Sequence, residues 1–143
     1  MKIPCRLVME MRIMGGSDVI MAPQRGNTHG TLSIEILTPN NVDGEEFFDF
    51  MQVVTDKWLD MKDLKGNFLR SRPHWAKQWE KLKVHGEDIV DYMRNVYADD
   101  IPEFAKLLHC VAEQGGFSLE DSMDMFSNEN LDYFFKDAVM NPK

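Results

Sequence analysis

Two segments near the start of the chain alternate apolar and polar residues with a period of two. Over residues 6–14 the apolar face carries Leu7, Met9, Met11 and Ile13, and over residues 31–37 it carries Leu32, Ile34 and Ile36. Successive side chains of a strand point to opposite sides, so each segment predicts a strand with one apolar face. Because two strands alone do not make a stable sheet, we expect upstream chain or a second copy to complete it.

Over residues 43–61 the period changes. Apolar residues now recur at three- and four-residue steps, at Phe47, Phe50, Met51, Val54, Trp58 and Met61. This spacing predicts an amphipathic helix, and Asp43 with Glu46 makes a plausible capping pair at its start. We expect the apolar face of this helix to pack on the sheet.

The rest of the chain reads mainly as helices. Residues 64–72 are predicted to be extended, and residues 86–97 and 101–114 to be helical, with a stop at Gly115-Gly116. Ser118 with Asp121 opens a last helical region, which breaks near residues 127–128 and resumes over 131–135. The sequence therefore predicts an α+β fold over residues 1–143, a single domain with an antiparallel sheet and helices packed on one side of it.

Composition narrows the class of protein. With 143 residues, 43% hydrophobic and 28% charged, the chain has the make-up of one globular domain. A net charge of -8 argues against a nucleic-acid partner, which normally requires a basic surface. No apolar run approaches a membrane span and no signal peptide follows Met1, so we expect a cytoplasmic protein. Cys5 and Cys110 lack metal-type spacing and are expected to be free thiols.

A first candidate for chemistry lies on the first predicted strand. Glu10 and Arg12 stand two residues apart, so their side chains point to the same face. A carboxylate beside a guanidinium can hold a polyhydroxylated substrate, and the guanidinium can stabilise developing negative charge. The alternative is an exposed surface ion pair of little energetic value.

The most unusual stretch packs two cations, an imidazole and an indole into six residues, Arg72-Pro73-His74-Trp75-Ala76-Lys77. Histidine can act as an acid or a base near neutral pH, and lysine supplies a positive charge beside an electron-rich ring. The alternative is a tryptophan anchored in the core with its polar neighbours in solvent. The other histidines have no acidic or cysteine partners at metal spacing, so no metal site is expected.

This stretch resembles a signature of the vanillyl-alcohol-oxidase flavoprotein family, written R-P-H-W-[AG]-K in L-gulonolactone, D-arabinono-1,4-lactone and alditol oxidases. Glu10-Met11-Arg12 is similar to the E-x-R strand of these enzymes. The loop 21–23 and the strand 32–37 are similar to the segments that follow it, and residues 124–134 are similar to the closing tail without its usual proline and glycine.

The resemblance spans nearly the whole chain but only the C-terminal, substrate-side part of such an enzyme. It implies FAD-dependent oxidation of a CH–OH group in a sugar lactone or alditol, with hydride transferred to a flavin held by a domain outside these residues. Carried over by position, the catalytic residues are Glu10, Arg12 and Lys77. His74 and Lys77 lie beside the cofactor, and Glu10, Arg12, Glu35 and His74 bind the substrate.

We expect the chain by itself to bind no FAD and to oxidise no lactone, because no glycine-rich anion loop stands at a strand-to-helix junction. The expected partners are a polyol or aldonolactone and an FAD-binding domain in cis or in trans. Two alternatives stay open. One is a non-catalytic interaction module that dimerises or binds a partner through its sheet edge. The other is a substrate-holding subunit that works with a separately encoded flavin domain.

Overall fold

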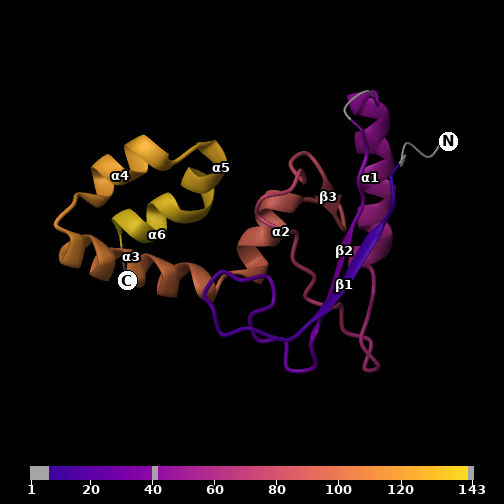
Figure 1. Cartoon of the computed structure of the whole chain (residues 1–143), viewed down its shortest axis with the longest axis horizontal. Coiled ribbons are helices and arrows are strands. Elements are labelled where there is room, and N and C mark those ends of the chain that lie inside the picture. Colours follow the sequence, from indigo (N-terminus) through magenta and orange to yellow (C-terminus); the bar gives the residue numbers. More distant parts are fainter. Residues whose placement is uncertain (1–6, 40–41, 142–143) are drawn as a thin grey trace.

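The chain folds into an elongated α+β molecule, and the computed structural model describes residues 7–39 and 42–141. A small antiparallel sheet and the helix α1 (Gly44–Leu59) occupy one end, and a group of helices occupies the other (Figure 1). The mixed fold class predicted from the sequence is confirmed at this level. Three parts of the fold are described further below: the sheet, the loop 15–30 that follows β1, and the segment 72–77.

The sheet consists of β1 (Glu10–Met14) and β2 (Thr31–Glu35). They pair antiparallel with Glu10 opposite Glu35 and Met14 opposite Thr31. Both strands are shorter than predicted: residues 7–9 and 36–37 lie outside them, and residue 6 lies outside the described residues. A two-stranded ladder has no third strand to hold its ends, which accounts for the short pairing.

Helix α1 begins as the sequence predicts. The Asp43 side chain accepts a hydrogen bond from the Glu46 amide at 3.0 Å, which confirms the predicted cap. We expected the apolar face of α1 to pack on the sheet of β1 and β2. It packs mainly against β3 (Lys83–Val84) instead. The α1 residues that join or contact the core are Phe48, Met51, Trp58 and Leu59.

A short hairpin replaces the start of the predicted helix over 86–97. β3 pairs antiparallel with β4 (Glu87–Asp88), and α2 (Ile89–Val96) begins only after it. The two turn residues, His85 and Gly86, both have positive φ, at 51° and 87°. Positive φ at both central positions is typical of a type I′ hairpin turn. This histidine–glycine turn signal was missed, and Asp88 caps α2 in place of a helix start at Gly86.

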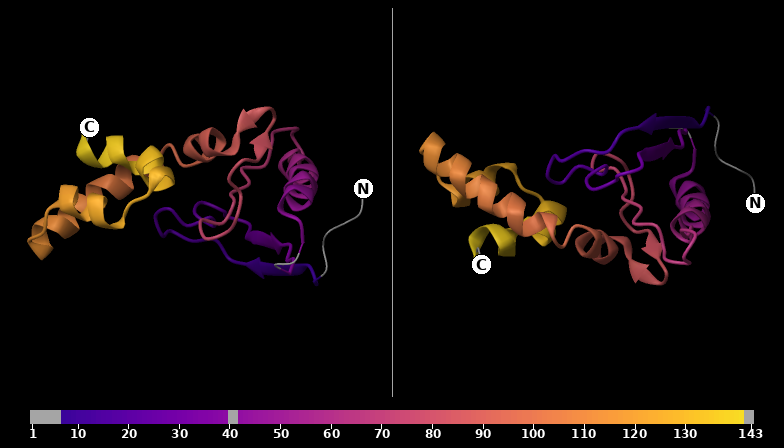
Figure 2. Two further views of the ribbon diagram at one scale, coloured as in Figure 1. Left: turned by 90° about the horizontal axis from the view of Figure 1, so that it is seen from above. Right: turned by 90° about the horizontal axis from the view of Figure 1, so that it is seen from below.

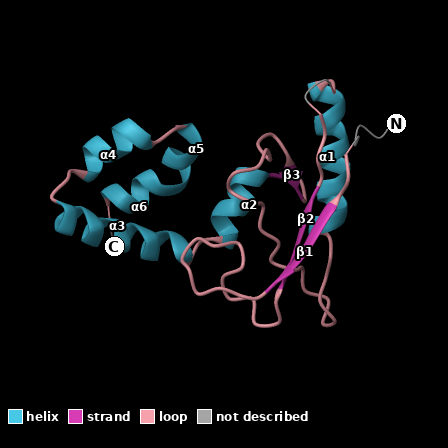
Figure 3. Cartoon of the chain, viewed as in Figure 1, coloured by secondary structure: helices cyan, strands magenta, loops and turns pink. Residues whose placement is uncertain are grey.

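The far end is helical (Figure 3). Its caps follow the sequence. α3 (Asp100–Gly115) ends at Gly116, whose φ of 66° is the left-handed conformation that glycine adopts at helix ends. Ser118 accepts a hydrogen bond from the Asp121 amide at the start of α4 (Leu119–Phe126). Asn128 starts the final helical run in the same way, and that run comprises α5 (Glu129–Leu131), the π-helical turn η1 (Asp132–Lys136) and α6 (Asp137–Met140).

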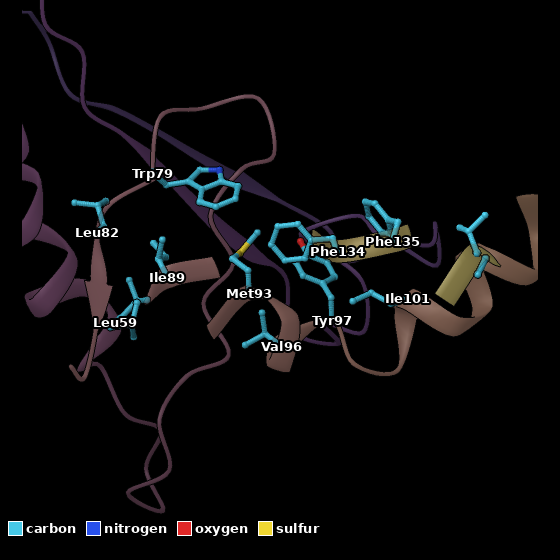
Figure 4. Packing of buried hydrophobic residues seen from close by; sticks show 13 residues of the cluster. Leu59, Trp79, Leu82, Ile89, Met93, Val96, Tyr97, Ile101, Phe134 and Phe135 are labelled. Carbon is cyan, nitrogen blue, oxygen red and sulfur yellow. The ribbon is translucent and has the colours of Figure 1, made fainter. Parts of the chain in front are cut away.

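One hydrophobic cluster runs through both ends of the molecule. Its buried members include Leu82, Ile89 and Met93 from the sheet end, and Phe134 and Phe135 from the helical end (Figure 4). The two ends are therefore joined by shared packing rather than by a bare linker. Among the described residues no helix is both long and apolar enough to cross a membrane.

Candidate functional site

The sheet of β1 and β2 turns its polar side toward the rest of the chain. On its apolar side Ile13 is 89% exposed and Met11 is 61% exposed. On its polar side the Glu35 side chain is only 19% exposed, whereas the Arg12 side chain is 61% exposed. The polar face is therefore covered at Glu35 and open to solvent at Arg12, and a binding site can form at this boundary.

Two ion pairs occupy this polar face. Arg12 donates to the Glu10 carboxylate on the same strand. Lys77, from the segment 72–77, pairs with Glu35 on β2. Glu10 and Glu35 lie directly opposite each other in the ladder. Two like charges at such a position repel, so each carboxylate needs the cation that accompanies it.

The pKa of Glu35 reflects the charged residues around it. Its hydrogen bond with Lys77 lowers the pKa of the Glu35 carboxyl most, and the positive charges of Lys77, Arg12 and His74 lower that pKa further, while partial burial opposes them. Glu35 is therefore ionised at neutral pH and is a weak base. It is suited to accept hydrogen bonds from hydroxyl groups rather than to remove protons.

His74 is exposed, and its ring is oriented by the backbone. Its Nδ1 accepts a hydrogen bond from the Ala76 amide at 3.1 Å. An occupied Nδ1 leaves Nε2 as the atom that can meet a ligand. The His74 carbonyl accepts from Trp79 Nε1 at 3.1 Å, which ties the same residue to the core.

Arg72 is a buried structural anchor. Its guanidinium, with a side chain only 5% exposed, donates to the carbonyls of Ala22 and Arg25 at 3.2 and 2.9 Å. It also lies over the Tyr97 ring at 4.8 Å. One planar cation thus fastens the loop after β1 onto the start of the helical end.

Trp75 holds the same loop from the core. Its Nε1 donates to the Met21 carbonyl at 3.0 Å, and its ring packs on Tyr97 and Phe134 with centroids 4.9 and 5.2 Å away. Met21 has a positive φ of 63°, which is uncommon for a residue with a side chain. The segment 72–77 therefore combines two anchors, Arg72 and Trp75, with Lys77, which reaches the polar face.

A second network of ion pairs attaches the loop after β1 to α3. Arg25 pairs with Asp100 and with Glu103, both at 2.6 Å, and Arg72 stands 3.8 Å from the same buried Asp100. The hydrogen bond with Glu103 is the largest of the effects that raise the pKa of Arg25. This network connects the loop after β1 to the first turn of α3 and so fixes where the sheet lies relative to the helices.

The structure joins four of the predicted site residues by ion pairs or strand pairing, Glu10, Arg12, Glu35 and Lys77, and the electrostatic effect of His74 also reaches Glu35. We call these five residues the charged cluster. Sequence reasoning missed Ser33, which lies opposite Arg12 on the same face. The signal was present, because Thr31, Ser33 and Glu35 alternate with apolar residues along β2. Within residues 7–39 and 42–141 no group of histidine, cysteine and acidic residues is placed to hold a metal ion.

The charged cluster and the rest of the described chain differ in how they fit a flavin. Lys77 and Arg12 supply positive charge of the kind that stabilises an electron-rich ring. The glycines do not supply a pyrophosphate site: Gly15-Gly16 follows β1 but leads into a loop rather than a helix, and Gly115-Gly116 closes a helix. Among the described residues, the charged cluster therefore supplies two cations, and neither glycine pair lies at a strand-to-helix junction.

Compared with protein-family models, curated proteins and solved structures, the chain gives no match.

Proposed function

We propose that this chain is the substrate-binding part of an FAD-dependent oxidoreductase acting on a CH–OH group of a sugar lactone or alditol, of the D-arabinono-1,4-lactone oxidase type. The observation that carries the proposal is the ion pair of Lys77 with Glu35. It joins the segment that resembles the family signature to the strand pair that resembles the family's E-x-R segment.

The cluster suits a neutral, hydroxyl-rich ligand. Its cations and carboxylates already balance one another, so it offers alternating donors and acceptors rather than a net charge. A polyol or lactone satisfies such groups through several hydrogen bonds, and charge-assisted bonds are the stronger ones. A phosphorylated or strongly anionic ligand would leave the two carboxylates uncompensated.

Within this proposal Glu10 and Glu35 accept hydrogen bonds from substrate hydroxyls, and Arg12 and Lys77 hold positive charge beside the oxidised carbon. His74, whose Nδ1 accepts from the Ala76 amide, has Nε2 left to bind the same ligand. FAD, held by a domain outside these residues, supplies the hydride acceptor. In this arrangement the chain binds and orients the substrate, and the cofactor carries the redox step.

The proposal is tested by titrating labelled protein with D-arabinono-1,4-lactone, L-gulono-1,4-lactone and xylitol while recording amide and side-chain NMR shifts. An open site buries little of its ligand and binds weakly, so dissociation constants of about 1–10 mM are expected. The shifts should centre on the charged cluster and disappear in a Glu35→Gln/Lys77→Met variant. They should persist in Lys106→Met, an exposed lysine on α3. Shifts that map elsewhere, or none at saturating lactone, would overturn the assignment.

A separate experiment tests whether the chain binds FAD by itself. The purified chain, mixed with FAD and desalted, should lose the yellow colour and oxidise none of these compounds. A retained flavin with turnover would mean that the chain itself builds a flavin site, and the division between two domains would be wrong.

A second candidate function is a non-catalytic interaction module. The exposed apolar side of the sheet favours it, because contiguous apolar surface on a protein is often an interaction site. The lactone titration distinguishes the two candidate functions. A non-catalytic interaction module gives no saturable NMR shifts at the charged cluster.

A further inference from the structure

β1 is an open sheet edge. In the sheet of β1 and β2 no other strand among the described residues pairs with β1, and it forms the outer side of the sheet (Figure 2). Its outward backbone groups are therefore available to another strand. Its apolar side chains are also the more exposed ones: Ile13 is 89% exposed, against 56% for Leu32 on β2.

The edge carries only part of the usual protection against pairing. Natural edge strands carry lysine, proline, bulges or inward-pointing charges. The sequence of β1 is Glu-Met-Arg-Ile-Met, without lysine or proline, and its two charges, Glu10 and Arg12, lie on the polar face and pair with each other. These charges disfavour a neighbour that opposes like charges and favour one that presents opposite charges.

The geometry points to a second copy of this chain as that neighbour, with β1 pairing antiparallel to β1 of the partner about a two-fold axis at Met11. This register follows from charge complementarity. It places Glu10 opposite the partner's Arg12 and Arg12 opposite the partner's Glu10, which adds two attractive pairs on the polar face.

The two neighbouring symmetric registers are poorer. An axis at Arg12 places the two arginines opposite each other, and an axis at Glu10 does the same with two glutamates, so each opposes like charges. With the axis at Met11 the apolar side is matched as well. Met9 then lies opposite the partner's Ile13, and the flanks of both are removed from water.

The result is one four-stranded sheet in the order β2–β1–β1–β2. A two-stranded sheet is marginal alone, and three or more strands with a hydrophobic face gain independent stability. The two charged clusters lie on the same side of this sheet, one in each copy. The inference concerns the edge of β1 alone and does not depend on the proposed redox function.

Disulfide trapping gives the sharpest test. Met11→Cys is made in the full chain with Cys5→Ser and Cys110→Ser, and mild oxidation is followed on non-reducing gels. Residues directly opposite across a two-fold axis have Cβ atoms about 4.5–5.5 Å apart, close to disulfide reach, so a covalent dimer is expected. Ile13→Cys in the same background should remain monomeric, because position 13 lies opposite Met9. Equal cross-linking at both positions, or none at either, overturns the proposed register.

Solution mass measurements separate edge pairing from other modes of association. A measurable fraction of the unmodified chain should be dimeric when the protein concentration is raised to about 500 µM, because small interfaces bind weakly. Met11→Lys should weaken dimerisation at least about tenfold by opposing two lysines, a change of about 1.4 kcal/mol. Leu32→Lys, on the same face but on β2, should leave it unchanged. Loss in both variants would mean that two sheets pack face to face, and a strictly monomeric chain would also refute the proposal.

Discussion

Lys77, at the end of the segment 72–77, forms an ion pair with Glu35 of β2, although the two residues lie far apart in the sequence. The hydrogen bond from Lys77 is the largest of the effects that lower the pKa of Glu35. This pair ties the segment to the sheet and sets the charge of the candidate site.

Replacing Lys77 by methionine should raise the pKa of Glu35 back toward its usual range, as read from the side-chain carboxyl carbon in an NMR titration. A lowered folded-state pKa stabilises the fold above the unfolded-state pKa, and that contribution is lost as pH falls through the folded-state value. The wild type should therefore lose stability on acidification more steeply than Lys77→Met. Lys106→Met is the matched control, and a Glu35 titration that is the same in all three proteins would contradict the ion pair.

Arg72 should be irreplaceable by lysine. Lysine keeps the charge but lacks the planar fork that reaches the carbonyls of Ala22 and Arg25. We expect Arg72→Lys to lower the free energy of unfolding by about 2–4 kcal/mol in urea denaturation, because buried acceptors lose their donors. Arg12→Lys, at an exposed arginine, should change it by less than about 0.5 kcal/mol. Equal effects would mean that Arg72 is not an anchor.

Trp75→Phe isolates the indole N–H. Phenylalanine keeps an aromatic ring among Tyr97 and Phe134 but leaves the Met21 carbonyl without its donor. A loss of about 1–3 kcal/mol in the free energy of unfolding is expected from that carbonyl and the smaller ring. Trp58→Phe on α1, at a partly buried tryptophan beside the core, should cost less. The reverse order in thermal or urea unfolding would refute the anchoring role.

The buried Tyr97 hydroxyl makes no hydrogen bond within the described residues, and burial raises its pKa to about 12. Tyr97→Phe should therefore be neutral or stabilise the fold by up to about 1 kcal/mol. Between pH 10 and 12 only the unfolded chain ionises this group, so wild-type stability should fall there, and less so in Tyr97→Phe. Tyr92 donates to the Ser71 carbonyl at 2.8 Å, so Tyr92→Phe should instead destabilise. Stabilisation by Tyr92→Phe but not by Tyr97→Phe would contradict this reasoning.

Local structure was readable from the sequence because it depends on neighbours in the chain. The alternation around Met11 and Leu32, the cap at Asp43 and the stop at Gly116 each involve residues a few positions apart, and the structure has all of them. The hairpin at His85 was missed because a two-residue turn carries little signal against the helix that follows it.

The candidate site was predictable only as a set of residues. Same-strand geometry places Glu10 beside Arg12 without further information. That Lys77 reaches Glu35 depends on contacts between distant parts of the chain, above all those of Arg72 and Trp75 with the loop after β1. No local pattern encodes such contacts.

The sequence by itself determined that each strand has an apolar and a polar face, because alternation is a property of the extended backbone. Only the tertiary structure decided which face is covered. Three ion pairs, Lys77 with Glu35 and Arg25 with Asp100 and Glu103, hold the sheet so that Glu35 on its polar face is covered and Ile13 on its apolar face lies in water. The physical reason is that a side chain's burial depends on what the whole chain, or a second copy of it, places against that side chain.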